Sequence, residues 1–319
     1  METVKEYQDY LAPMEGITNW IYRTAYHRYF HPMDRYFTPF ISGKHNKRLS
    51  QKEEEEISPE KNKGMCVIPQ ILTNQAEDFI QLARIFQQYG HGEVNLNLGC
   101  PSGTVAAKKK GAGFLGEPRK LEAFLDEIFS ALDIRISIKT RIGIDDPEEW
   151  ELLLKIFQKY PMSELIVHPR LLSDFYGNSP NLEAFARAVE SLDVPVCYNG
   201  DLFTPEDCQA FSGRFPQVHR FMYGRGVIRY PGLLDLVREG KPMTREKLQG
   251  FHDCIYHAYQ ERLSGDRNVL FRMKELWNHM LFSFEDTASY GKKIRKVQKT
   301  GEYEAIVEGL FAECDIRTF

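Results

Sequence analysis

The sequence has no long apolar segment. No run of residues approaches the roughly 18 consecutive apolar residues that a membrane-spanning helix requires. The first residues, METVKEYQDYLAPMEG, carry charge where a secretory signal needs an apolar stretch. We therefore expect a cytoplasmic protein with no membrane partner.

Cysteine pairs with metal-ligand spacing are also missing. The six cysteines, at positions 66, 100, 197, 208, 254 and 314, include no C-x-x-C pair and no Cys/His cluster. We expect neither a disulfide framework nor a metal site. The net charge of −4 argues against a protein that coats nucleic acid in bulk, and we expect a monomer without a DNA partner, although a local basic surface remains open.

Short apolar runs alternate with amphipathic helical patterns up to about residue 237. Eight runs predict strands, and no G-x-G-x-x-G opens a dinucleotide-binding fold. Eight strands with intervening helices over about 230 residues favour an α/β fold of the TIM (β/α)8 barrel type. The predicted strands are 10–14, 36–41, 67–72, 94–99, 136–142, 165–170, 195–201 and 220–226.

The second unit of this alternation is the weakest. Its connecting segment, SGKHNKRLSQKEEEEISPEKNKG, has no clean helical pattern, and we expect an exposed loop or a short helix. The acidic run inside it is typical of a solvated surface.

The strand pattern stops near residue 240. Helical patterns follow, with apolar stripes on two of them: Leu248, Phe251, Ile255 and Tyr259 on the first, and Leu270, Met273, Trp277 and Met280 on the second. We therefore predict a barrel domain over 1–240 and a small C-terminal helical bundle over 245–319.

Unusual polar residues follow the predicted strands. Since chemistry in a TIM barrel gathers at the carboxyl ends of its strands, these residues are the candidates for a site. They are Pro13 and Met14, Gln70, Asn97 with Cys100, Lys139 with Arg141, His168 with Arg170, Asn199-Gly200-Asp201, and Gly224-Arg225-Gly226. A buried amide at one such position is more commonly a satisfied structural group, so the argument rests on their shared phase.

The last two groups, after the seventh and eighth predicted strands, indicate a phosphate-binding site. NGD after strand seven and GRG after strand eight offer backbone N–H groups and a cation where barrels commonly hold a phosphate, although two tight turns would also favour glycine. Lys139 and His168 come from strands five and six and could donate to the ring of a phosphorylated planar cofactor.

These residues, in this order, resemble the tRNA-dihydrouridine synthase family. The matching segments are LAPMEGITNWIYR, PQILTNQAEDF, NLNLGCPSGTVAAKKKGAGFL, SIKTRIG, VHPR, YNGDLFTPEDC and MYGRG, which together span the barrel. The helical tail is similar to that family's RNA-binding domain. The resemblance implies an FMN-bound barrel that uses NADPH to reduce the C5–C6 double bond of uridine in RNA, with tRNA the expected substrate.

The resemblance also implies a role for each residue. Cys100 would be the general acid and Asn97 would hydrogen-bond the target base, with Arg141 and Arg170 as further RNA contacts. The cofactor-binding residues would be Pro13, Met14, Gln70, Lys139, His168, Asn199, Asp201, Gly224 and Arg225. One segment departs from the family pattern: HPRLLSDFYG differs after Arg170, which leaves the usual RNA contacts of this loop open.

A cysteine suits the proposed acid step. Reducing uracil needs a hydride at C6 and a proton at C5, and a thiol with an ordinary pKa near 8.5 is mostly protonated at neutral pH. We expect the turn at Cys100 to lie in a mobile loop, for which AAKKKGAGFLG supplies cations for RNA phosphates and glycines for closure.

The segment GKKIRKVQKTG (291–301) holds five cations and no acid. Helical spacing predicts Lys292, Arg295, Lys296 and Lys299 along one side, as an RNA grip or as a solvated helix face. An RNA substrate also fits the need to take the uracil out of its stack.

Two other functions stay open. One is an FMN barrel that acts on a small pyrimidine, and the other is a non-catalytic RNA-binding protein with a degenerate barrel. A third possibility is a dihydrouridine synthase that acts on an RNA other than tRNA. The position of the target uridine and the choice between NADPH and NADH also stay open.

Overall fold

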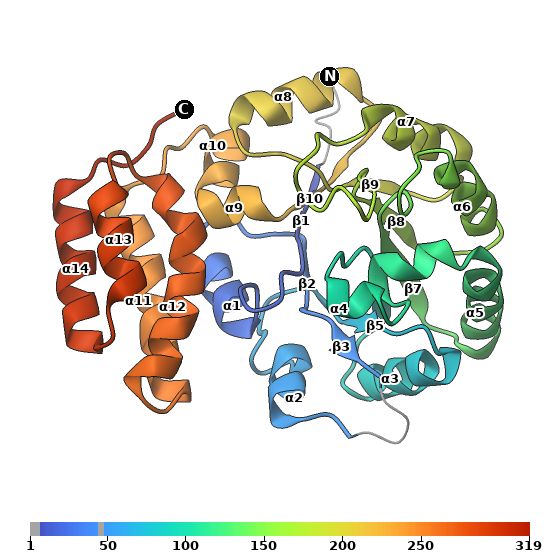
Figure 1. Ribbon diagram of the computed structural model, residues 1–319, viewed down its shortest axis with the longest axis horizontal. Helices are drawn as coiled ribbons and strands as arrows, with labels where there is room; N and C mark the ends of the chain where they lie inside the picture. The colour runs from blue at the N-terminus through green and yellow to red at the C-terminus, as the bar shows by residue number, and fades with distance from the viewer. Residues whose placement is uncertain (1–6, 44–47) are drawn as a thin grey trace. The chain divides into compact units, whose positions relative to one another are not determined.

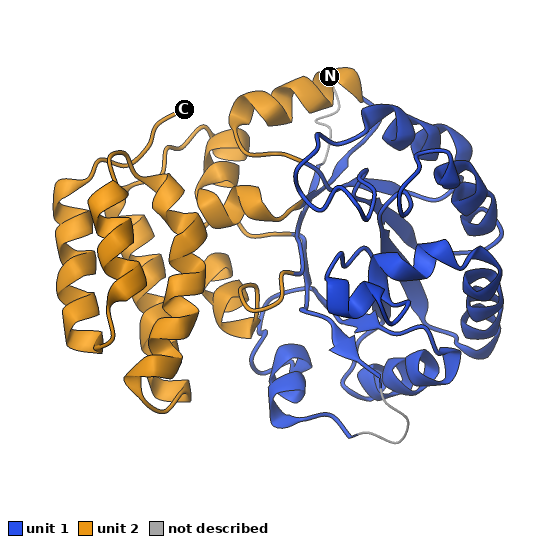
Figure 2. Cartoon of the chain, viewed as in Figure 1, with its two compact units in different colours: residues 1–13, 34–200, 216–222 blue, residues 14–33, 201–215, 223–319 orange. Residues whose placement is uncertain are grey.

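The computed structural model describes residues 7–43 and 48–319, which fall into two compact units (Figure 2). Unit 1 comprises Met1–Pro13, Asp34–Gly200 and Pro216–Met222, and unit 2 comprises Met14–Met33, Asp201–Phe215 and Tyr223–Phe319. The chain thus passes between the units several times. The predicted division into 1–240 for catalysis and 245–319 for RNA binding stays a prediction, and its residues 1–6 and 44–47 lie outside the described ones.

Unit 1 is built around a sheet of short parallel strands (Figure 1). The order of hydrogen-bonded neighbours is β3-β5-β6-β7-β8-β9-β10-β1-β2-β4. The strands are β1 (Gln8–Leu11), β2 (Arg35–Phe37), β3 (Ile41–Ser42), β4 (Val67–Ile68), β5 (Gln70–Leu72), β6 (Glu93–Leu98), β7 (Arg135–Thr140), β8 (Glu164–Val167), β9 (Val196–Tyr198) and β10 (Arg220–Tyr223).

Two prolines explain why ten strands appear where the sequence predicts eight. Pro39 separates β2 from β3, and Pro69 separates β4 from β5, because proline has no backbone N–H to give to a ladder. The pieces still pair in register, β2 with β4 and β3 with β5. The last strand in this order is β4 and the second is β5, yet only Pro69 separates them along the chain. The two ends of the strand order therefore meet at this proline, and the sheet closes. The predicted TIM (β/α)8 barrel is confirmed.

Helices surround these strands in unit 1. Apolar side chains from several strands fill the interior of the barrel: Tyr10, Ala12, Phe37, Ile68, Ile166, Cys197 and Met222. The outer helices α3, α5, α6 and α7 cover the sheet (Figure 1). The helices of unit 1 are α2 (Gln51–Ile57), α3 (Ala76–Gln88), α4 (Gly103–Ala106), η1 (Gly111–Gly116), α5 (Pro118–Ala131), α6 (Glu149–Phe157) and α7 (Leu182–Ser191).

The weak second connection contains the short helix α2. Ser50 begins it with a capping box, in which its hydroxyl accepts from the Glu53 N–H and the Glu53 carboxylate accepts from the Ser50 N–H. The acidic run is only partly a solvated surface, because Glu56 is buried together with Ile57. The part of the predicted loop at 44–47 lies outside the described residues.

Unit 2 is helical, and both predicted apolar stripes are buried in it. The hydroxyl of Tyr303 lies 2.7 Å from Trp277 Nε1, which donates to it, and 2.6 Å from His252 Nε2. The helices are α1 (Trp20–Tyr29), α8 (Pro205–Arg214), α9 (Arg225–Arg229), α10 (Leu233–Glu239), α11 (Arg245–Arg262), α12 (Asp266–Met280), η2 (Leu281–Ser283), α13 (Ala288–Lys296) and α14 (Thr300–Glu313).

Charged residues begin five of the strands and meet at the amino ends of the barrel. Arg35 Nη1 lies 3.1 Å from Glu93 and 3.7 Å from Glu164, and Arg220 Nη1 lies 3.3 Å from Glu164. The Tyr10 hydroxyl donates to Glu164 Oε1 at 3.1 Å. Burial nevertheless raises the pKa of Glu164 to about 7, because desolvation outweighs the two guanidinium groups.

Candidate active site

A ladder of buried amides crosses β5, β6 and β7. Asn97 Nδ2 donates to Gln70 Oε1 at 2.7 Å, and Gln70 Nε2 donates to Asn95 Oδ1 at 2.8 Å. Asn95 Nδ2 in turn donates to Ser137 Oγ at 3.0 Å. All four side chains are buried. The ladder therefore fixes the orientation of both predicted site amides, Gln70 and Asn97.

Asn97 also holds the turn that carries Cys100. Its side-chain Oδ1 accepts from the backbone N–H of Gly99 at 3.0 Å and from that of Cys100 at 2.9 Å. This is the local geometry by which asparagine shapes turns. The backbone at Cys100 is thus anchored to the barrel through one side chain.

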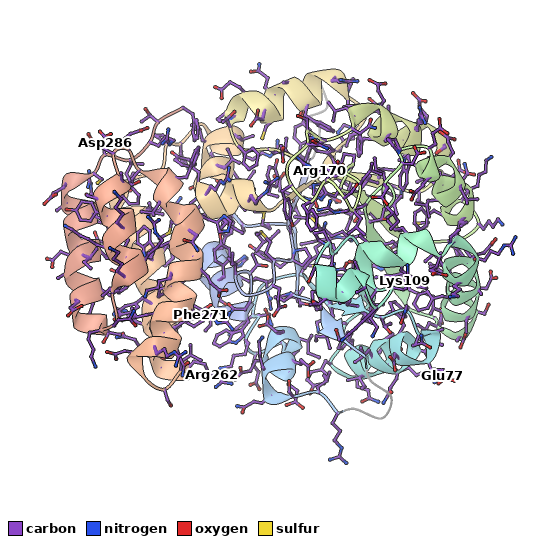
Figure 3. The ribbon with its side chains drawn as sticks, in the orientation of Figure 1. Glu77, Lys109, Arg170, Arg262, Phe271 and Asp286 are labelled. Carbon is purple, nitrogen blue, oxygen red and sulfur yellow. The ribbon has the colours of Figure 1, made fainter. Side chains whose placement is uncertain are left out.

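Two glycines of the loop after Cys100 approach their neighbours closely, and the predicted mobility of this loop stays a prediction. A Cβ on Gly111, whose φ is +57°, would lie 2.9 Å from both the Cβ and the carbonyl oxygen of Cys100. A Cβ on Gly113 would lie 2.6 Å from the Ala106 carbonyl oxygen. These glycines permit close approach of α4 and η1 to the cysteine. Lys109 in the same loop is exposed, as Figure 3 shows.

Lys139 lies on β7 beside the amide ladder without an acidic partner. In the part of the chain that the structure describes, its ammonium makes no hydrogen bond and no ion pair, and its side chain is partly buried. Burial, followed by the positive charge of Arg141, lowers the pKa of Lys139 to about 8. An ammonium in this position suits an electron-rich or anionic ligand.

Arg141 joins two loops of the barrel. Its side chain is fully buried, and its Nε, Nη1 and Nη2 donate to the carbonyl oxygens of Gly99 (3.2 Å), Leu171 (2.6 Å) and Phe175 (2.6 Å). Arg141 thus clamps the loops that follow β6 and β8, and its RNA contact stays a prediction.

His168 and Arg170 pair with each other after β8. Arg170 Nη1 lies 2.9 Å from His168 Nε2, and Arg170 Nε donates to the Asn178 carbonyl at 2.6 Å. Because guanidinium only donates, His168 Nε2 accepts, which places the ring proton on Nδ1 of a neutral imidazole. Arg170, labelled in Figure 3, is 1% exposed, and its RNA contact stays a prediction.

Asn199 and Gly200 follow β9. The Asn199 Nδ2 donates to the Met222 carbonyl at 2.8 Å, and the Asn199 N–H donates to the Val167 carbonyl at 3.0 Å. A Cβ on Gly200 would lie 2.0 Å from the Tyr198 hydroxyl, so only glycine fits there. Asn199 therefore ties β9 to its neighbours on both sides.

The remaining predicted cofactor residues lie in unit 2. Arg225 Nη2 pairs with Asp201 Oδ1 at 2.7 Å, and the Arg225 guanidinium lies 5.2 Å from the centre of the Phe203 ring. Arg225 is the first residue of α9, after Gly224. Both partners of the ion pair keep part of their surface exposed, which suits an arginine that could also take a phosphate.

The turn after Pro13 also belongs to unit 2 from Met14 onward. The Met14 N–H donates to Thr18 Oγ1 at 2.7 Å, and the Met14 carbonyl accepts from the N–H groups of Ile17 and Thr18. The backbone at Met14 is therefore fixed by the turn that precedes α1.

The residues present fit a phosphorylated ring cofactor. Within unit 1, the Lys139 ammonium lies beside oriented amides and forms no ion pair with any described residue. Among residues 7–43 and 48–319, no group of three or more His, Cys, Asp or Glu side chains could hold a metal ion. Within the same residues, no helix is long and apolar enough to cross a membrane.

The basic segment after residue 290 differs in one respect from its prediction. Its five cations, Lys292, Lys293, Arg295, Lys296 and Lys299, are exposed and form no ion pair with any described residue. However, α13 ends at Lys296, and Lys299 is the residue before α14. The predicted single stripe is thus divided between a helix and the start of the next one.

Sequence reasoning missed Asn95 and Ser137. Asn95 stands two residues before Asn97 and so lies on the same face of β6, and Ser137 is its partner in register on β7. The sequence signal that could have identified Asn95 is the pair of asparagines, two residues apart, inside one buried strand.

Comparisons with known proteins point to one family. The sequence matches the family model for dihydrouridine synthase (Dus) over residues 10–312. It is 29% identical to a tRNA-dihydrouridine(16) synthase of Pseudomonas putida, with 85% of this chain and 87% of that protein covered. It is 32% identical to a tRNA-dihydrouridine(20/20a) synthase of Vibrio cholerae, with 66% and 67% covered.

Solved structures add evidence for the fold alone. A variant of NCR from Zymomonas mobilis has a TM-score of 0.53 at 13% identity, covering 76% of this chain and 90% of that one. Morphinone reductase has a TM-score of 0.53 at 12% identity, covering 76% and 88%.

Proposed function

Because the chain belongs to the dihydrouridine synthase family, we propose that it reduces the C5–C6 double bond of a uridine in tRNA to 5,6-dihydrouridine, with FMN as cofactor and NADPH as reductant. Membership makes the chain an oxidoreductase of the dihydrouridine synthase type. The observation that carries the proposal is the anchored turn, in which Asn97 holds Cys100 beside the ammonium of Lys139 on the neighbouring strand.

Reduction adds a hydride to C6 of the uracil and a proton to C5. FMN held by the residues of the site would supply the hydride, with NADPH as the reductant. The Cys100 thiol donates the proton to C5. Its position depends on the two hydrogen bonds from the backbone to Asn97 Oδ1, so Asn97 acts on the reaction through the turn as well as through any contact with the base.

Several residues would hold the cofactor. Lys139 would face its electron-rich ring, with neutral His168 donating from Nδ1 and Gln70 held in place by the amide ladder. Arg225 would bind the phosphate. Pro13, Met14, Asn199, Asp201 and Gly224 complete the proposed set.

The RNA would be bound by the exposed cations of 291–301, so that 245–319 serves as an RNA-binding region. Five cations with no acid among them attract phosphates without reading sequence. The target base must leave its stack, which costs least in a single-stranded loop.

The test is dihydrouridine formation on an unmodified tRNA transcript with FMN and NADPH, measured by mass spectrometry. Cys100→Ala should bind FMN yet lose about 10²–10⁴-fold in rate, as expected for loss of a general acid. Cys66→Ala, which removes an exposed cysteine of the same unit, is the matched control. Turnover of free uracil or dihydroorotate without activity on RNA would instead support the small-pyrimidine function.

A further inference from the structure

The loop that follows β8 presents two aromatic side chains to solvent. Phe175 is 54% exposed and Tyr176 is 49% exposed, although large aromatic side chains usually bury most of their surface.

The loop is rigid. Arg141 donates to the carbonyl oxygens of Leu171 and Phe175, both at 2.6 Å, and Arg170 donates to that of Asn178 at 2.6 Å. Both guanidinium groups are buried. Two charged donors thus fix the loop at its beginning, middle and end.

Further contacts hold the same loop to its neighbour. The Asp174 carboxylate accepts from the Leu171 N–H at 2.8 Å, and the N–H groups of Leu172 and Ser173 donate to the carbonyl oxygens of Gly143 (2.9 Å) and Ile144 (3.0 Å). The exposed rings therefore stand on a fixed backbone.

Phe175 is held in a strained conformation. Its φ is +48°, in the left-handed region that a bulky side chain rarely adopts. Such strain persists where the surroundings determine the backbone, and it concentrates at functional sites. In the free protein, Phe175 combines backbone strain with an apolar ring in water.

One guanidinium connects this loop to the acid. Arg141 donates from Nη2 to the Phe175 carbonyl and from Nε to the Gly99 carbonyl, the residue before Cys100. The Tyr176 ring is already engaged, with its centre 5.4 Å from the Arg141 guanidinium carbon and 6.0 Å from the His168 ring. Arg141 therefore links the backbone at Phe175 to the turn that carries Cys100, and the Phe175 ring is exposed.

We propose that Phe175 is a stacking platform for the unpaired nucleobase next to the target uridine. This inference rests on the proposed function. When the target base leaves its stack, its neighbour loses a stacking partner, and an aromatic side chain replaces it without reading its identity. A rigid ring needs no ordering on binding, which favours affinity.

The test is a double-mutant cycle between the protein and the RNA. One tRNA transcript is unmodified, and two others carry an abasic nucleotide on the 5′ or the 3′ side of the target uridine. Binding and steady-state turnover are measured for the wild type, Phe175→Leu, which keeps an apolar side chain without a ring, and Phe175→Trp, which keeps a ring. Leu152→Ala, at a 51% exposed residue of α6, is the surface control.

Stacking predicts coupled losses. Phe175→Leu should raise the KM for the unmodified RNA by about 5- to 100-fold, with a smaller effect on kcat, and Phe175→Trp should restore it. One abasic RNA should bind the wild type as weakly as Phe175→Leu binds the unmodified RNA, with no further loss in the combination.

The outcomes separate the two proposals. If the wild type forms no dihydrouridine on RNA, the proposed function fails. If the wild type is active while Phe175→Leu keeps the wild-type KM, or if neither abasic RNA couples to residue 175, the stacking platform is overturned and the function stands.

Discussion

Replacing Glu164 by glutamine should make the protein more stable at pH 8 and leave its stability at pH 4.5 nearly unchanged. Glu164 is 1% exposed and opens β8 among the charged groups at the amino ends of the strands. Glutamine keeps its size and an oxygen for the Tyr10 hydroxyl, and it cannot ionise.

The magnitude follows from the pKa of Glu164, which burial raises from 4.5 to about 7. Each unit of pKa difference between the folded and unfolded states corresponds to about 1.4 kcal/mol. The charged carboxylate therefore lowers the free energy of unfolding by about 3 kcal/mol. Between pH 4.5 and 7 the folded state binds the proton more tightly than the unfolded state does. This contribution is therefore fully present below pH 4.5 and is lost as the pH rises through 7.

The assay is urea unfolding of the wild type and Glu164→Gln at pH 5, 6, 7 and 8. The advantage of the variant should grow by about 2–3 kcal/mol across this range, or about 1 M or more in midpoint. Glu151→Gln, at a half-exposed residue paired with Arg187, should show no such growth. An advantage of Glu164→Gln that stays constant with pH, or declines, would refute the reasoning.

Two other predictions concern the ligands. Lys139→Ala should weaken FMN retention about tenfold or more at pH 7 and less at pH 9, because the wild-type ammonium titrates near pH 8. Equilibrium dialysis with FMN measures the retention, and an equal loss at both pH values would contradict the prediction. Adding Arg225→Ala should weaken retention further, and full FMN occupancy in the double variant would show that the site is misplaced. Reversal of Lys292, Lys296 and Lys299 to glutamate should lower the salt slope of tRNA binding by up to about three, and an unchanged slope would exclude this segment as an RNA grip.

A parallel strand that is buried on both faces appears in the sequence as a run of apolar residues. Eight such runs are visible, and they predicted the barrel. Strand boundaries were less accurate: the prediction for 36–41 became two strands around Pro39. The carboxyl-end rule also located Cys100 and Lys139, since it needs only the order of strands.

Burial of the arginines could not be predicted in the same way. Arg141 and Arg170 read as phosphate contacts because arginine is usually exposed. Their carbonyl partners, at Leu171, Phe175 and Asn178, come from a loop whose path depends on the folded barrel. The pairing of Gln70 with Asn97 is likewise a tertiary contact, 27 residues apart in sequence.

The two prolines in the barrel have a consequence for its motions. Between β2 and β3, and between β4 and β5, the backbone ladder is interrupted, and the Thr38 hydroxyl accepts the Gln70 N–H at 3.0 Å in place of a carbonyl. Because each proline removes one N–H from the ladder, local opening at this seam should cost less free energy than at the uninterrupted pair of β6 and β7. Gln70 lies on that seam, so the amide ladder that orients Asn97 borders an interrupted part of the sheet.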